Sequence, residues 1–336
     1  MKHNIQLDLA RVMAIILVLY NHYYCYDFFL SCNNPSLIHY ILLIPSIICK
    51  CGPPLFFMIS GALLLGKKET YSYIISHRVF RIVIVMFFTA CLTNYSSLSF
   101  SNVLNCLFSG LNWYFYAYLG FLLLLPIYRA IAQNLNKDEW NSVVGFIVLI
   151  NAINAFCKIL NINVAVLNNM QPLVSGWASS SWQWSFPLLG YYLYNNLELF
   201  KANKTKWSSV SILSIVISML FIRIDILKTG GENYEMFHQY FIVAPTVLLF
   251  GSILSFEKMP NIIYETIKYI APLTFGMFIL ETQTGLSATI FGITNASIGN
   301  YFGLMIISWI SIFIKFFVFA IIVYTIRLIP IIKKYI

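Results

Sequence analysis

Long apolar runs separated by short polar connections make up almost the whole chain. Each run is long enough to cross the hydrocarbon core of a bilayer, which takes about 20 helical residues. The runs lie at residues 5–30, 38–66, 75–94, 112–132, 140–160, 183–200, 207–226, 237–256, 265–292 and 301–329. This pattern predicts an all-α polytopic membrane protein, a bundle of about ten transmembrane helices. It also places the whole chain, residues 1–336, in a single integral membrane domain with no fused soluble domain.

The positions of lysine and arginine predict how these helices are oriented. Fifteen of the basic residues near the ends of the runs fall on one side, and three, Lys158, Arg223 and Lys228, fall on the other. Short cytoplasmic loops carry the excess of positive charge in membrane proteins. Both termini are therefore expected in the cytoplasm, in a multi-pass protein of the cytoplasmic membrane.

The composition supports a membrane protein and argues against a nucleic-acid-binding one. The chain is 60% hydrophobic and 10% charged, whereas soluble domains are about 25% charged. Its net charge of +9 comes from basic residues in short loops, where they set topology, and no nucleic-acid motif is present. The histidines and the seven cysteines lack the spacing of metal ligands, so no metal site is expected.

The first apolar run contains three titratable residues, Asp8, Arg11 and His22. On a helix, Asp8 and Arg11 are three residues apart and can form an ion pair. Arg11 and His22 are eleven apart, which is three turns plus roughly 20°, so His22 lies on the same face about 16 Å further along the axis. Charged residues in an apolar helix usually face the bundle interior or a polar cavity. This face is therefore the first candidate for a functional site.

Four motifs resemble, in the same order, those of the membrane acyltransferase-3 family. The first is Asp8-x-x-Arg11 followed by ten residues and His22. The others are Phe56–Leu64 (FFMISGALL), His77–Ile82 (HRVFRI), and Asn112–Leu119 (NWYFYAYL) followed by Pro126. The spacing of Arg11 and His22 is the most specific of these signals, and the other three add weight together.

The resemblance implies roles for five of these residues. His22 would be catalytic, deprotonating an acceptor hydroxyl or helping to move the acyl group, which imidazole can do near neutral pH. Arg11 would position a substrate or stabilise developing negative charge, and Asp8 would hold Arg11. Arg78 and Arg81 would bind acyl-CoA, since arginine offers paired donors to phosphate. Arginines that only set topology would look the same in the sequence.

Three residues near the second and fourth predicted helices are candidates for substrate binding. Trp113 and Tyr116 begin the fourth helix at the predicted outer surface. They suit either a platform for the acceptor or an interfacial aromatic belt. Ser60 lies before Gly61 without the Gly-x-Ser-x-Gly elbow of a nucleophile, so a substrate contact competes with a role in helix packing.

Glu281 is an acid within the ninth apolar run, and an intramembrane carboxylate is a functional candidate by default. It could pair with Arg11, His22 or Lys315 across the bundle. Members of the family often have a histidine at the comparable position. Glu281 is therefore either a member of the active site or a charge partner.

The resemblance implies an acyltransferase that moves an acyl group from a cytoplasmic acyl-CoA to a hydroxyl of a cell-surface or lipid-linked polysaccharide. Acetyl is the first expectation for the group, with acetyl-CoA as a donor substrate and no permanently bound cofactor. The expected partners are the acyl-CoA, the glycan acceptor, membrane lipid, and a separate acyltransferase or glycan-assembly protein. The alternative is a transporter or flippase of a lipid-linked sugar, which would use the same charged face as a path.

Overall fold

The computed structural model describes residues 4–22, 37–94, 99–108, 113–160, 185–229, 241–283 and 301–330. These residues form helices, and no strand occurs among them. Residues 23–30 of the first apolar run and Asn112 of the fourth motif lie outside the described residues.

The helices of the described residues have the following bounds. In chain order they are α1 (Ile5–Asn21), α3 (Leu37–Ile48), η1 (Cys49–Cys51), α4 (Gly52–Leu64), α5 (Tyr71–Tyr73), η2 (Ile74–Val79), α6 (Phe80–Thr93), α7 (Phe100–Leu107), α8 (Trp113–Leu123), α9 (Leu125–Asn134), α10 (Lys137–Ile159), α12 (Phe186–Asn195), α13 (Leu197–Ala202), α14 (Lys204–Thr229), α16 (Val243–Leu254), α17 (Asn261–Ile270), η5 (Ala271–Leu273), α18 (Thr274–Gln283) and α20 (Tyr301–Ile326).

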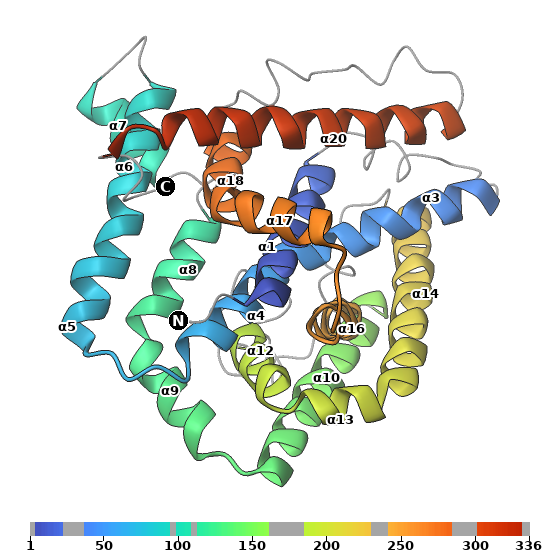
Figure 1. Ribbon diagram of the computed structural model, residues 1–336. Coiled ribbons are helices and arrows are strands. Elements are labelled where there is room, and N and C mark those ends of the chain that lie inside the picture. Colours follow the sequence, from blue (N-terminus) through green and yellow to red (C-terminus); the bar gives the residue numbers. More distant parts are fainter. Residues whose placement is uncertain are drawn as a thin grey trace.

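Helix α1 runs through the middle of the assembly (Figure 1). Its first turn is capped by Asn4, whose side-chain oxygen accepts a hydrogen bond from the backbone N–H of Leu7 at 3.1 Å, as favourable N-caps do. The small residues Ala10 and Ala14 are fully buried and let neighbouring helices approach. Helices α4, α16, α17, α18 and α20 all contact α1, so residues on different sides of α1 face different helices.

Helices α4 and α12 cross where two glycines face the partner backbone. A methyl group at Gly61 would overlap the carbonyl oxygen of Pro187, and one at Gly190 would overlap that of Met58. The two backbones therefore touch at this crossing, which is how small residues bring helices together in membrane proteins. This contact fixes α4, and with it the face of α4 that carries Phe56 and Ser60.

Several helical stretches of the described residues are long and apolar enough to cross a membrane. These are Leu43–Leu64, Tyr71–Cys91, Lys204–Lys228, Asn261–Thr282 and Trp309–Ile326, and α8 with α9, bent by 62°, adds a sixth if the pair is one broken span. The protein is thus a multi-pass helical membrane protein.

The described residues give fewer spans than the ten that the apolar runs predict. The count of ten treats each run as one spanning helix, but some runs form shorter helices. Helix α16, for example, has 12 residues, which rise about 18 Å against a hydrocarbon core of about 30 Å. The ten spans and the cytoplasmic position of both termini stay predictions.

The outer faces of α14 and α20 are apolar and exposed. Ile212, Leu213 and Leu220 on α14, and Phe317 and Ile321 on α20, are each more than half exposed. On a protein in water such faces would be costly, whereas lipid tails cover them without cost. The exposure of these side chains fits helices at the lipid boundary.

The α4–α12 crossing predicts a stability effect. Gly61→Ala or Gly190→Ala forces the two backbones apart, and overpacking of this kind costs about 1–3 kcal/mol. We expect a lower melting temperature for either variant in detergent, measured by the fluorescence of a fused reporter during heating.

The matched control is Gly145→Ala on α10, where nothing lies within 4 Å of the added carbon. Alanine there removes only the helix penalty of glycine, so its melting temperature should stay the same or rise slightly. Equal melting temperatures for Gly61→Ala and Gly145→Ala would show that the crossing is not tight.

Candidate active site

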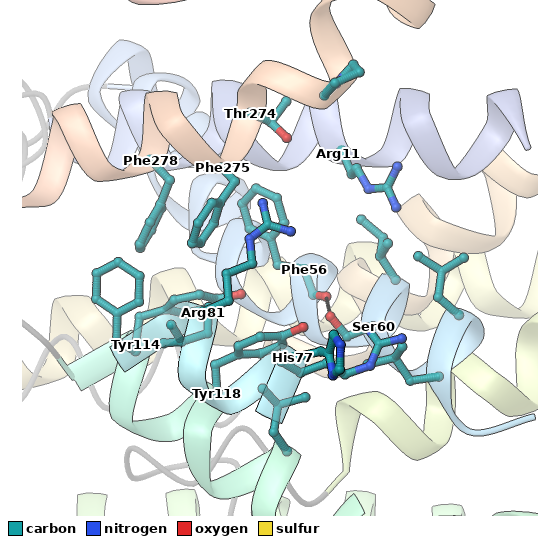
Figure 2. Close-up of a pocket in the computed structure, with 18 of the residues that line it drawn as sticks. Arg11, Phe56, Ser60, His77, Arg81, Tyr114, Tyr118, Thr274, Phe275 and Phe278 are labelled. Carbon is teal, nitrogen blue, oxygen red and sulfur yellow. Dashed lines mark hydrogen bonds between the residues drawn. The ribbon is translucent and has the colours of Figure 1, made fainter. Parts of the chain in front are cut away.

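A cavity of about 460 Å³ opens between α1, α4, η2, α6, α8 and α18. It has a basic end and an aromatic end (Figure 2). Its walls are made by Arg11, Phe56, Ile59, Ser60, Leu63, Leu64, Tyr73, His77, Arg78, Arg81, Ile82, Tyr114, Phe115, Tyr118, Leu122, Ala271, Pro272, Thr274, Phe275 and Phe278.

Three arginines from two segments far apart in the sequence line this cavity. Arg11 comes from α1, Arg78 from the π-helical turn η2, and Arg81 from the first turn of α6. Wide turns of the π type are rare in helices and frequently occur at functional sites. Arg81 extends into the cavity (Figure 2), and its guanidinium carbon lies 5.7 Å from the centre of the Phe275 ring. Arg11 is held by Asp8, one turn before it on α1, as the spacing predicts.

Glu69, in the connection between α4 and α5, fixes the orientation of Arg78. Its carboxylate accepts hydrogen bonds from Nε and Nη2 of Arg78 at 3.2 and 2.6 Å, and from Nη2 of Arg129 at 3.1 Å. Arg129 also donates to the carbonyl of Leu64 at 3.0 Å, at the end of α4. Partial burial raises the pKa of Glu69, but the hydrogen bonds from Arg78 and Arg129, together with the charges of Arg78 and Lys67, outweigh it and hold that pKa below its ordinary value.

The other end of the cavity is built from aromatic rings. The ring centres of Tyr114 and Phe278 are 4.8 Å apart, and Phe56 lies 6.3 Å from each of them. Contacts of this kind are favourable for rings packed at an angle. This end of the wall comes from α4, α8 and α18. It lies across the cavity from Arg11, and Arg81 extends between the two (Figure 2).

One turn beyond Phe278 on α18, Glu281 joins two charged groups from other helices. Nδ1 of His22, at the end of α1, lies 3.4 Å from Oε1 of Glu281, and Nζ of Lys315 on α20 lies 2.9 Å from Oε2. The side chains of Glu281 and Lys315 are 1% and 4% exposed, whereas that of His22 is 38% exposed. The buried carboxylate therefore connects an accessible imidazole to a buried ammonium group.

A family model described as an acyltransferase domain matches residues 4–327, nearly the whole chain. The chain belongs to the acyltransferase-3 family. Searches of curated proteins and of solved structures returned no match. The protein is therefore a membrane-bound acyltransferase, and the two groups of residues described above are the places to look for its chemistry.

Five of the residues singled out in the sequence of this acyltransferase lie at the cavity or directly behind it. Arg11, Ser60, Arg78 and Arg81 line it, and Asp8 is the buried partner of Arg11. The Ser60 hydroxyl donates to the carbonyl of Phe56 at 2.9 Å, one turn earlier in α4. Ser60 thus shares the wall with the aromatic end.

His22 and Glu281 form a second group, which is not part of the cavity wall. The rise per residue of an α-helix places His22 about 16 Å beyond Arg11 along α1. In the structure His22 follows directly after the last residue of that helix. Of the three partners considered for Glu281, the structure supplies His22 and Lys315. Arg11 instead pairs with Asp8.

Trp113 and Tyr116 lie on the outer side of α8, away from the cavity wall. They are 37% and 39% exposed, and the Tyr116 hydroxyl donates to the carbonyl of Leu107 at 3.0 Å. The cavity is lined instead by Tyr114 and Tyr118. These two are four residues apart and so share a helix face, a spacing in the sequence that could have identified them.

Two other features of the acyltransferase were missed in the sequence. Glu69 lies in a short connection and contacts Arg129, 60 residues later, so its role depends on the tertiary fold. His77 stacks on Tyr73, with ring centres 4.3 Å apart, and both line the cavity. Among the described residues, no three His, Cys, Asp or Glu side chains gather as a metal site would require.

The Glu69 contacts predict a pH-dependent contribution to stability. A carboxyl group whose pKa is lowered by folding stabilises the protein above its ordinary pKa, and this contribution is lost as pH falls through the lowered value. Glu69→Gln should therefore cost about 1–3 kcal/mol at pH 7. We expect the difference in melting temperature from wild type to shrink below about pH 4.

Glu257→Gln is the control for this measurement. Glu257 is 80% exposed and contacts Lys201 at 3.4 Å, and an exposed pair contributes little to stability. A difference between Glu69→Gln and wild type that stays constant as the pH falls from 7 to about 3, well below the ordinary pKa of a glutamate, would contradict the role assigned to the Glu69 carboxylate.

Proposed function

We propose that this acyltransferase takes an acyl group, acetyl in the first instance, from acyl-CoA and transfers it to a hydroxyl of a cell-surface or lipid-linked polysaccharide. The observation that carries the proposal is the two-ended cavity, with arginines at one end and aromatic rings at the other. An acyl-CoA has the matching chemistry, with phosphates at one end of the molecule and an apolar thioester arm at the other.

The basic end suits the phosphates of the donor. Arg81 and Arg11 both line the cavity, and guanidinium groups form paired, charge-assisted hydrogen bonds with phosphate oxygens. Arg78 is oriented by Glu69, so it presents its remaining donors in a fixed direction. The aromatic end formed by Phe56, Tyr114 and Phe278 would hold the thioester arm.

His22 is the proposed catalytic base. Its imidazole would take the proton of the acceptor hydroxyl while that oxygen attacks the thioester carbonyl carbon. The carbon–sulfur bond then breaks, and the thiolate of CoA takes the proton back from His22. Glu281, 3.4 Å from Nδ1, would orient the ring and stabilise its positive charge during the transfer. Because Arg11 is about 16 Å from His22 along α1, its proposed role is to hold the donor.

The proposed membrane topology has about ten spans and both termini in the cytoplasm. The basic loops support this orientation, because Lys67, Lys68 and Arg78 would all lie on the cytoplasmic side. That side is the one where acyl-CoA is present. His22, at the opposite end of α1 from Asn4, would lie nearer the outer face, where a surface glycan is available. A separate acyltransferase or glycan-assembly protein would complete any further transfer.

His22→Ala tests the proposed base. In cells that lack the gene, we expect wild type to restore the acyl modification of the surface glycan and His22→Ala to leave it at the background level. Mass spectrometry of the glycan would detect the loss of one acyl group per repeat unit and identify the group.

The matched control is His39→Ala on α3, a helix whose described side chains do not line the cavity. It should restore acylation as wild type does. Full acylation by His22→Ala would contradict the assignment of the base. If cells that lack the protein instead make a fully acylated glycan that accumulates inside the cell, the protein would be a transporter.

A further inference from the structure

Lys315 lies in one of the most apolar parts of the chain. The stretch Trp309–Ile326 of α20 is long and apolar enough to span a membrane, and Lys315 is its one charged residue. Its side chain is 4% exposed. A lysine in such a place is costly and is retained mainly where it serves a function. The sequence motifs shared with the family do not include it.

The ammonium group of Lys315 is placed to balance the charge of Glu281. Nζ donates a hydrogen bond to Oε1 of Glu281 at 2.9 Å and lies 2.9 Å from Oε2 as well. It also lies 6.0 Å from the centre of the Phe319 ring, an arrangement that favours a cation. Glu281 therefore faces one charged group on α20 and one titratable group, His22, on α1.

An unbalanced carboxylate in apolar surroundings takes up a proton to avoid the cost of its charge. A protonated Glu281 would donate a hydrogen bond to Nδ1 of His22, and the imidazole proton would then reside on Nε2. In that tautomer Nε2 has no lone pair to accept a proton. A charged Glu281 has the opposite effect, because it accepts the Nδ1–H and leaves Nε2 as the base.

We infer that Lys315 is a positioning residue for acyl transfer, which keeps Glu281 in the form that holds His22 ready to accept a proton at Nε2. This inference rests on the proposed function of His22 as the base. The transfer step is unchanged: the acceptor proton moves to Nε2, the new carbon–oxygen bond forms, the carbon–sulfur bond breaks, and sulfur takes the proton from Nε2. Lys315 contacts neither substrate and acts through Glu281.

A purely structural role for Lys315 makes a different prediction. Removing one partner of a buried ion pair is strongly destabilising, whereas replacing both by uncharged residues of similar size is often neutral or stabilising. If Lys315 only neutralised Glu281 for folding, the Lys315→Met protein that folds would keep the kcat of wild type. If it acts through Glu281 on His22, folded Lys315→Met protein would have a lowered kcat.

The experiment compares Lys315→Met, Lys315→Arg, Glu281→Gln and the double variant Lys315→Met with Glu281→Gln. Membranes with equal amounts of each protein and the native acceptor would be supplied with acetyl-CoA, and thiol release would be measured against its concentration. We expect Lys315→Met to lower kcat by about 100-fold, the size of a general-base contribution, with little change in KM for acetyl-CoA. Lys315→Arg should recover most of kcat because it keeps the positive charge.

The kcat of folded Lys315→Met decides between the two roles, and the double variant is the control for stability. We expect the double variant to melt at or above the temperature of Lys315→Met and to remain as inactive as Glu281→Gln alone. Recovery of kcat in the double variant, or full kcat in Lys315→Met, would overturn the inference. His22→Ala is measured in parallel. If His22→Ala keeps its activity, the proposal that His22 is the base is overturned. If His22→Ala is inactive and Lys315→Met is fully active, only the role of Lys315 is overturned.

Discussion

Charge inside an apolar helical bundle has to be balanced where it lies, and this constraint organises the described part of the protein. Asp8 balances Arg11 within α1. Glu69 balances Arg78 and Arg129, and so joins η2 and α9 to the end of α4. Glu281 balances Lys315 and contacts His22, and so joins α18, α20 and the end of α1. The Glu69 and Glu281 groups fix helices relative to one another, because a displaced partner would leave a charge unpaired.

In the proposed function, two tasks are separated along the length of α1. Arg11 lies at the cavity, with its basic and aromatic ends, whereas His22 lies at the end of the helix beside Glu281. Helix α18 links the same two places, since Phe278 lines the cavity and Glu281 follows it by one turn. Two helices thus connect the cavity, where we propose that the donor is held, with the Glu281 group, where we propose that the proton is transferred.

Local patterns in the sequence predicted those features of the site that are determined by residue spacing within a single helix. The spacing of Asp8 and Arg11 predicted their ion pair, and the acid in the ninth apolar run predicted a functional carboxylate with a small set of partners. The resemblance to the acyltransferase-3 family was confirmed by the match over residues 4–327. The catalytic roles of Asp8, Arg11 and Glu281 stay predictions.

The remaining features depend on contacts that no local pattern contains. Glu69 meets Arg129 only because the α4–α5 connection folds back on α9. The choice between the Trp113–Tyr116 face and the Tyr114–Tyr118 face of α8 depends on which neighbours cover that helix. The described residues contain five or six long apolar stretches, and the ten spans expected from hydropathy stay a prediction, because an apolar run can also form a short buried helix such as α16.

The central claim is that the donor is held in the cavity while the chemistry belongs to His22. The most direct test is calorimetric binding of coenzyme A to the purified wild type, Arg81→Ala and His22→Ala. The account predicts that Arg81→Ala weakens binding about tenfold or more, as the loss of a charge-assisted hydrogen bond does. It also predicts that His22→Ala binds coenzyme A as tightly as wild type. Unchanged binding by Arg81→Ala, or binding lost in His22→Ala, would contradict the separation of the two tasks.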